Sequence, residues 1–121
     1  MSTEMKELHS EAELGRLLQE PCVVIFKHST RCSISTRAQA MVQQFADEHP
    51  SIPVYVVRVI ESRQVSNYLA GELGVRHQSP QVLFIRFGEV VWHGSHFEIS
   101  QRNLNDAVAK ADCAPGRDGR R

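Results

Sequence analysis

Cys32 is followed three positions later by Ser35, where a dithiol redox site would carry a second cysteine. A serine cannot close a disulfide with Cys32. If Cys32 is reactive, its thiolate can attack a disulfide and form a mixed disulfide, which an outside thiol must then resolve. The Cys-x-x-Ser spacing therefore predicts thiol–disulfide chemistry that uses a single protein thiol.

The neighbours of Cys32 favour its thiolate form. Cys32 lies between an apolar, strand-like run and a helix-like stretch, so its sulfur would meet unpaired backbone N–H groups and the positive end of a helix dipole. Arg31 is adjacent, and Lys27 and His28 are close in sequence. Ser35 could donate a hydrogen bond to the sulfur or could cap the helix. This setting indicates a nucleophilic cysteine.

The three cysteines have different predicted roles. An inert Cys32 is the alternative to a reactive one, because cysteine also serves as a small apolar residue in cores. The residues at 29–31 are polar, however, and indicate an exposed site. Cys22 starts an apolar run and is predicted to be an inert structural thiol. Cys113 is predicted to be incidental, or to be a resolving thiol for Cys32.

Other catalytic motifs fit the sequence less well. Arg37 gives Cys-x₄-Arg, one residue short of the Cys-x₅-Arg phosphate loop of cysteine phosphatases. The sequence has no glycine-rich phosphate loop. His93 and His96 form a weak H-x-x-H pair, which solvated loop histidines explain better than a metal site does. We therefore expect no bound metal.

Ser79 and Pro80 immediately precede an apolar run. A proline at the entrance of a strand can be an ordinary turn residue. A cis bond is the alternative, and it would expose the backbone of Ser79 to a bound thiol partner. Cis X-Pro bonds are a minority in folded proteins, so the local sequence does not decide between the two.

Composition limits the class of protein. The chain has 121 residues, 41% hydrophobic and 23% charged residues, and a formal net charge of +0. These values are typical of a globular domain and give no electrostatic reason to expect nucleic acid or a membrane as a partner. The polar N-terminus has no signal-peptide core, and the apolar runs are too short to cross a bilayer. We therefore expect a cytoplasmic protein.

The apolar pattern predicts one α/β domain over residues 1–111 and a disordered tail over 112–121. Ser10 and Glu13 form a capping-box pattern at the start of a helix that ends near Gln19. A helix between the first two strands makes them parallel, and a closing hairpin is antiparallel. The fold class is thus a four-stranded mixed β-sheet flanked by helices on both faces. The other predicted elements are strands at 22–26, 54–59, 81–86 and 90–92, and helices at 35–48, 62–73 and 100–110.

Three motifs resemble the YtxJ-type monothiol bacilliredoxin family of the thioredoxin-like superfamily. They are Lys27-His28-Ser29, Arg31-Cys32-Ser33-Ile34-Ser35 and Ser79-Pro80-Gln81. The resemblance covers roughly residues 8 to 110 and implies a thioredoxin-like fold. Two positions depart from the family pattern, because Arg31 replaces a threonine and Ser33 replaces a proline. Both changes can alter the acidity and redox poise of the thiol.

The resemblance implies a thiol–disulfide oxidoreductase in the cytoplasm. Cys32 would attack a client protein–bacillithiol mixed disulfide, take up the bacillithiol, and be regenerated by a second low-molecular-weight thiol. Bacillithiol, or a similar thiol, would be a co-substrate, with no bound cofactor. S-thiolated client proteins would be the partners. The implied catalytic residues are Cys32 and Ser35, and the implied substrate-binding residues are Arg31, Ser33, Ile34, Ser79, Pro80 and Gln81.

Two other functions remain open at this point. One is a monothiol glutaredoxin-like enzyme that uses glutathione and could assemble an iron–sulfur cluster with one cysteine per subunit. The other is a non-catalytic thioredoxin-fold module that binds partners or senses thiol stress. The identity of the small thiol distinguishes a glutaredoxin-like enzyme from a bacilliredoxin. The reactivity of Cys32 distinguishes a non-catalytic module from both enzymes.

Overall fold

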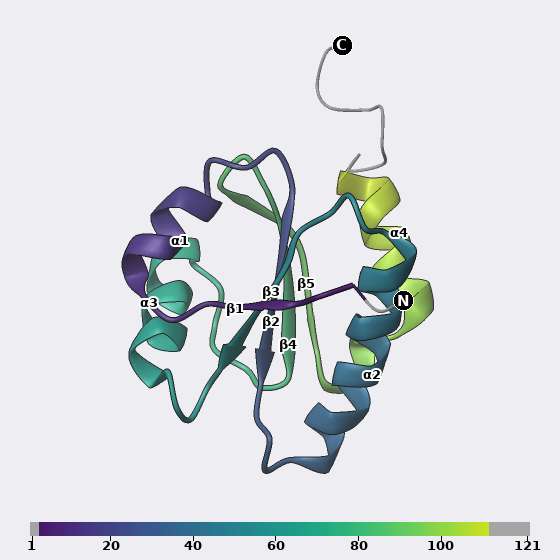
Figure 1. The fold of residues 1–121 in the computed structure, drawn as a ribbon, viewed down its shortest axis with the longest axis horizontal. Coiled ribbons are helices and arrows are strands. Elements are labelled where there is room, and N and C mark those ends of the chain that lie inside the picture. The colour runs from purple at the N-terminus through teal and green to yellow at the C-terminus, as the bar shows by residue number, and fades with distance from the viewer. Residues whose placement is uncertain (1–2, 112–121) are drawn as a thin grey trace.

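The computed structural model describes residues 3–111, so the predicted tail and Cys113 lie outside the described residues. Helices and strands alternate along most of this range (Figure 1). Within it, no helix combines the length and apolar character needed to span a membrane. The elements are β1 (Lys6–Glu7), α1 (Glu11–Leu17), β2 (Val23–His28), α2 (Ser33–Glu48), β3 (Val54–Arg58), α3 (Arg63–Leu73), β4 (Gln81–Arg86), β5 (Glu89–Ser95), the 3₁₀ turn η1 (His96–Glu98) and α4 (Gln101–Ala111).

The sheet has five strands in the order β1-β3-β2-β4-β5, where the sequence predicted four. β2 and β3 are parallel and β4 and β5 are antiparallel, as predicted. β1 is parallel to β3, and β4 is antiparallel to β2. The additional strand is β1, which pairs Lys6 with Tyr55 and Glu7 with Val56. Two charged residues carry no apolar alternation, so only the backbone pairing with β3 reveals this strand.

Helices cover both faces of the sheet (Figure 1). α2 and α4 lie on one face and α1 and α3 on the other, and each pair encloses its own apolar cluster. All six residues of β2 are buried, as expected of a central strand in a sheet that helices cover on both faces. Along β2, Val24 and Phe26 belong to the α2 side, and Val23 and Ile25 to the α1 and α3 side.

Several element boundaries differ from the predicted ones. The capping box of Ser10 and Glu13 is present, but α1 ends at Leu17 rather than near Gln19. β2 begins one residue later than predicted and continues to His28, because two polar residues at its end keep their strand pairing. α2 begins at Ser33, two residues early. The sequence placed the boundary at Ser35, whereas the backbone turns helical directly after Cys32.

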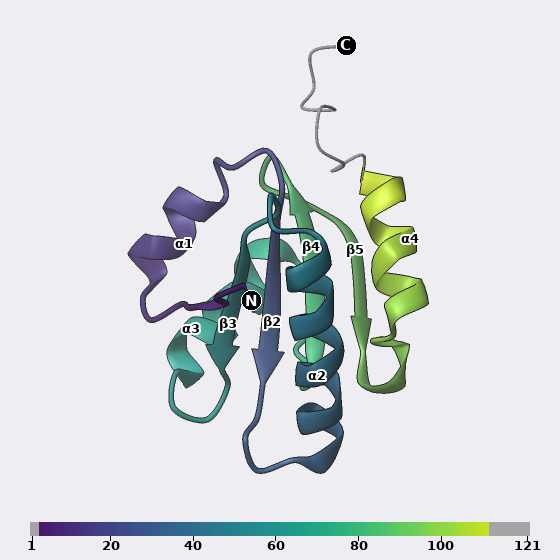
Figure 2. The same cartoon turned by 45° about the vertical axis from the view of Figure 1, so that its right-hand side comes forward.

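The C-terminal end of β2 brings distant segments to one edge of the sheet. β4 starts beside it, with Gln81 opposite Lys27, so the Ser79-Pro80 segment lies next to the chain leaving β2. That chain turns and enters α2 directly after Cys32 (Figure 2). This edge therefore carries both predicted parts of the site.

Candidate functional site

Cys32 is the N-cap residue of α2. Its backbone is extended, with φ −118° and ψ 125°, and its carbonyl oxygen accepts the N–H of Thr36 at 3.0 Å. Its own N–H donates to the carbonyl of Ser29 at 3.3 Å. The side chain is half-buried and makes no capping hydrogen bond, and Cys32 is the free cysteine within residues 3–111. The thiol is therefore available at the positive end of a helix.

Ser35 is fully buried and holds the loop that carries Cys32. Its Oγ accepts the backbone N–H of Ser29 at 2.9 Å and lies 2.7 Å from Nδ1 of His28. No hydrogen bond joins Ser35 to Cys32 among the described residues. The sequence left open whether Ser35 donates a hydrogen bond to the sulfur or caps the helix. The structure favours neither role, because the Ser35 hydroxyl joins the loop to the end of β2.

His28 shares a hydrogen bond with Ser35. Its Nδ1 lies 2.7 Å from Oγ of Ser35, and either atom can be the donor, because a serine hydroxyl has one proton and two lone pairs. Burial lowers the pKa of His28, and the charge of Arg58 lowers it further, against an opposing effect of Glu61. His28 is therefore neutral near pH 7.

A second polar cluster lies on the other face of the sheet. Lys27 is fully buried, and its Nζ lies 3.0 Å from Nδ1 of His77, which is also 3.2 Å from Oγ of Ser66. Burial lowers the pKa of Lys27 to about 8. Because successive strand residues face opposite sides, Lys27 points away from the face that carries His28. Sequence reasoning missed the Lys27–His77 pair, since no local pattern joins residues so far apart.

The Ser79-Pro80 segment is fixed beside this edge. The Ser79–Pro80 peptide bond is cis. The carbonyl of Pro80 accepts the N–H of His96 at 3.0 Å, and Nε2 of Gln81 donates to the carbonyl of Arg76 at 3.1 Å. Oγ of Ser79 is buried and has no hydrogen-bond partner in the described part of the chain. Gln81 is buried, so its side chain supports the loop.

The remaining predicted site residues flank Cys32 to different degrees. Arg31 and Ser33 are exposed, and Ile34 is half-buried. Glu61 has a lowered pKa, chiefly through its own backbone N–H and the Arg58 side chain, and Arg31 contributes as well. The positive charge of Arg31 therefore acts on the same edge of the sheet.

Arg37, which the sequence weighed as a phosphate ligand, points elsewhere. Its Nη1 donates to the carbonyl of Ile99 at 3.5 Å, and its guanidinium lies 5.5 Å from the centre of the Phe97 ring. Across residues 3–111, no group of three or more His, Cys, Asp or Glu side chains could hold a metal ion.

The prediction for Cys22 is wrong. Cys22 is disulfide-bonded and is not an inert free thiol. It precedes β2 by one residue, is half-buried and packs against the apolar cluster on the α2 and α4 side. Cys113, the candidate resolving thiol, lies outside the described residues.

Comparisons with known proteins identify a family and a fold. The family model for the monothiol bacilliredoxin BrxC matches residues 6–104. A solved thioredoxin-fold protein to which oxidoreductase activity has been attributed is 30% identical, with a TM-score of 0.79, over 84% of this chain and 91% of its own. Thioredoxin of Malassezia sympodialis is 15% identical, with a TM-score of 0.74, over 90% and 91% of the two chains. Thioredoxin of Trypanosoma brucei brucei is 14% identical, also with a TM-score of 0.74, over 88% and 93%. The last two show the fold alone.

Proposed function

Because the chain belongs to the monothiol bacilliredoxin (BrxC) family, we propose that it removes bacillithiol from mixed disulfides on client proteins. The family and the thioredoxin fold make it a thiol oxidoreductase. Bacillithiol as the co-substrate, S-thiolated proteins as clients and Cys32 as the nucleophile are our proposal. We also infer a cytoplasmic location, because the cycle needs a pool of reduced small thiols.

The proposed cycle has two exchanges. The Cys32 thiolate attacks the bacillithiol sulfur of a client mixed disulfide, so a bond forms between Cys32 and bacillithiol and the client leaves as a thiolate. A second small thiolate then attacks the bacillithiol sulfur on Cys32. This step releases the small-molecule disulfide and restores the Cys32 thiolate. Each exchange forms one S–S bond and breaks one, so no other oxidant or reductant is needed.

The observation that carries this proposal is the contrast between Cys32 and Ser35. Cys32 is a free, half-buried thiol at the start of α2. Ser35 is buried and engaged by Ser29 and His28. The position three residues after Cys32 thus offers neither a thiol nor an accessible side chain, so Cys32 has no resolving thiol where a dithiol site would carry one.

The other proposed site residues would hold the substrates. Ser79, Pro80 and Gln81 would form one side of the docking edge, next to the end of β2. Arg31 and Ser33 are exposed beside the thiol, and Ile34 offers a partly accessible apolar surface. Arg31 adds a positive charge that would attract an anionic small thiol.

The test is the release of bacillithiol from a purified client whose single cysteine carries it. The intact protein should release bacillithiol and show the adduct mass on Cys32, whereas Cys32→Ser should reduce the rate to the uncatalysed value. The Lys110→Met variant, changed at an exposed position of α4, serves as the folded control. Release by Cys32→Ser at the rate of the intact protein would overturn the proposal.

Two arms of the same assay separate the alternatives. A glutathionylated form of the client reports whether glutathione serves as well, and faster release of glutathione than of bacillithiol would favour a glutaredoxin-like enzyme. A Cys113→Ser variant tests the resolving role of Cys113. If Cys113 resolves Cys32, the variant should accumulate the Cys32 adduct when no small thiol is supplied.

A further inference from the structure

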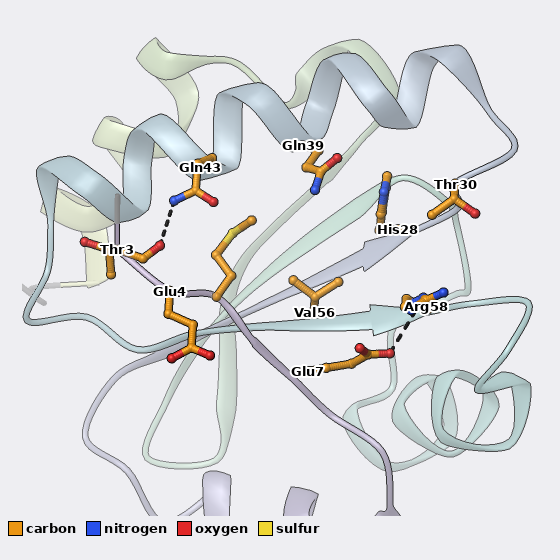
Figure 3. Close-up of a pocket in the computed structure, with 10 residues that line it drawn as sticks. Thr3, Glu4, Glu7, His28, Thr30, Gln39, Gln43, Val56 and Arg58 are labelled. Atoms are coloured by element: carbon orange, nitrogen blue, oxygen red, sulfur yellow. Dashed lines mark hydrogen bonds and ion pairs between the residues drawn. The ribbon is translucent and has the colours of Figure 1, made fainter. Parts of the chain in front are cut away.

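The end of β2 places two polar side chains on opposite faces of the sheet. His28 lines a polar pocket of about 550 Å³ between α2, β3 and the segment that leads into β1 (Figure 3). Thr30 and Arg58 stand at the same end of this pocket, where two glutamates pair with Arg58. Lys27 points to the other face. There, the part of the chain that the structure describes offers its charge no carboxylate.

The side chain of Lys27 is held by a single ring. It is fully buried, and its Nζ lies 3.0 Å from Nδ1 of His77, a residue that is itself exposed. An ammonium group donates hydrogen bonds and cannot accept them, so Nδ1 of His77 is the acceptor and the ring is neutral. A buried cation that meets only a neutral ring costs stability, and an apolar side chain would suit this position of β2 better. The charge therefore needs a reason other than folding.

Lys27 contacts the chain on both sides of the Ser79-Pro80 segment. This segment belongs to the loop at residues 74–80, which joins α3 to β4. The backbone of Lys27 pairs with Gln81, which directly follows the segment. Its side chain reaches His77, which precedes the segment by two residues. One residue of β2 thus bounds the proposed docking segment at both of its ends.

The other contacts of this loop leave buried polar atoms without a partner. Oγ of Ser79 and Oε1 of Gln81 are buried and have no hydrogen-bond partner within residues 3–111. Such atoms cost free energy, so contacts elsewhere must hold the loop in this conformation. His77 provides them, because its Nδ1 meets Nζ of Lys27 and lies 3.2 Å from Oγ of Ser66. Ser66 belongs to α3, so Lys27 is the residue that joins His77 to β2.

We propose that Lys27 is a positioning residue, which acts through His77 to hold the Ser79-Pro80 segment where a client polypeptide docks beside Cys32. The inference rests on the proposed function, because it concerns the client half of the mixed disulfide. β2 leads directly into the loop that carries Cys32. The same strand therefore fixes the thiol and, through Lys27, the segment that receives the client.

The test compares a reaction that needs docking with one that does not. The first substrate is a short peptide whose single cysteine carries bacillithiol, and kcat and KM for its release are measured with a fixed excess of reduced bacillithiol. The second is 2-hydroxyethyl disulfide, which has no polypeptide to dock. In both reactions the Cys32 thiolate bonds to one sulfur of the disulfide, and the other sulfur leaves as a thiolate.

Lys27→Met removes the contact with His77 and keeps the length of the side chain. KM for the peptide should rise about tenfold with kcat unchanged, because a displaced docking segment weakens peptide binding equally before and during the exchange. The rate with 2-hydroxyethyl disulfide should stay within about twofold of that of the intact protein, since no docking is involved. Lys110→Met is the matched control, because it makes the same change at an exposed position of α4 and should alter neither reaction.

A double variant tests whether Lys27 acts through His77. In the Lys27→Met background no ammonium is left for His77 to accept, so adding His77→Leu should raise KM by no more than about twofold further. A further rise of about tenfold would show that the two side chains act independently, and it would overturn the proposal.

Two other results would overturn the positioning role alone. One is an unchanged KM for the peptide in Lys27→Met. The other is an equal slowing of the peptide and of 2-hydroxyethyl disulfide in that variant, since a general loss of order at Cys32 would then explain both. If the intact protein releases no bacillithiol from the peptide, the proposed function itself fails.

Discussion

Ser35 stabilises the loop before Cys32 through two hydrogen bonds in a buried position. Its Oγ is hydrogen-bonded both to the N–H of Ser29 and to Nδ1 of His28, and the side chain is fully buried. Water cannot replace these bonds without opening the loop. At the residue scale, Ser35 therefore supports the site by fixing where the chain turns towards Cys32, rather than by touching the sulfur.

Removing the Ser35 hydroxyl should destabilise the protein. Ser35→Ala leaves two polar groups without a partner, and we expect the free energy of unfolding to fall by about 1–3 kcal/mol, the usual cost of such groups. Urea denaturation followed by circular dichroism measures the change. Ser33→Ala, at an exposed position on the same helix, should stay within about 0.5 kcal/mol of the intact protein. Equal stability of the two variants would contradict the role of Ser35.

At the scale of elements, β2 ends in two polar residues that serve opposite faces of the sheet. His28 faces the α2 side, stacks 5.2 Å from the ring of Phe26 and lines the polar pocket. Lys27 is fully buried towards the α3 side and meets His77. A cationic side chain buried without a carboxylate partner costs stability, which indicates that Lys27 is not kept for folding alone.

Replacing Lys27 by an apolar side chain of similar length should stabilise the domain. Lys27→Met removes the buried charge and leaves His77 bonded to Ser66, so we expect the free energy of unfolding at pH 7 to rise by about 1 kcal/mol or more. Urea denaturation at pH 7 measures the gain. Lys110→Met, at an exposed position of α4, should have little effect. A loss of stability in Lys27→Met would show that the Lys27–His77 contact outweighs the cost of burial.

Lys27 should also make the free energy of unfolding depend on pH in the alkaline range. The pKa of Lys27 is about 8 in the folded protein, below its usual 10.5, so between these values the unfolded chain binds the proton and the folded protein does not. Stability should therefore rise as pH increases from 8 to 10.5. Denaturation midpoints across this range should rise in the intact protein and rise less in Lys27→Met. Identical slopes would contradict the assignment.

At the scale of the whole molecule, two histidines on opposite faces of the sheet have pKa values below the usual value for histidine. Burial is the main cause of the lowered pKa of both His28 and His77; nearby positive charges, Arg58 for His28 and Lys27 with Arg63 for His77, add to it. Because the pKa values of both histidines in the folded protein are below the usual 6.5, their full contribution to the free energy of unfolding is present above pH 6.5. It is lost as pH falls towards the folded values.

Mild acid should therefore weaken the fold before most carboxylates titrate. We expect the free energy of unfolding to decrease between pH 6.5 and about 5, where ordinary Asp and Glu side chains remain charged. Urea denaturation at half-unit pH steps measures this slope. His28→Gln should reduce the slope, because one of the two groups that take up protons on unfolding is gone. A profile that is flat from pH 7 to 5 would contradict the prediction.

Much of the fold was predictable because its signals are local. The capping box of Ser10 and Glu13, the left-handed Gly74 at the end of α3 and the apolar run of β2 each depend on residues close in sequence. The position of Cys32 at the start of a helix follows from the same kind of pattern. β1 was missed because two charged residues become a strand only through pairing with β3.

The sequence by itself determined the order of helices and strands, the lone thiol at the start of a helix and the absence of a second thiol at Ser35. These depend on residue type, spacing and short-range backbone preferences. Tertiary structure alone decided what Ser35 holds, which residue meets Lys27 and where a polar pocket opens beside Thr30. The physical reason is distance along the chain: Lys27 and His77 are 50 positions apart, and only the packed sheet brings such groups together.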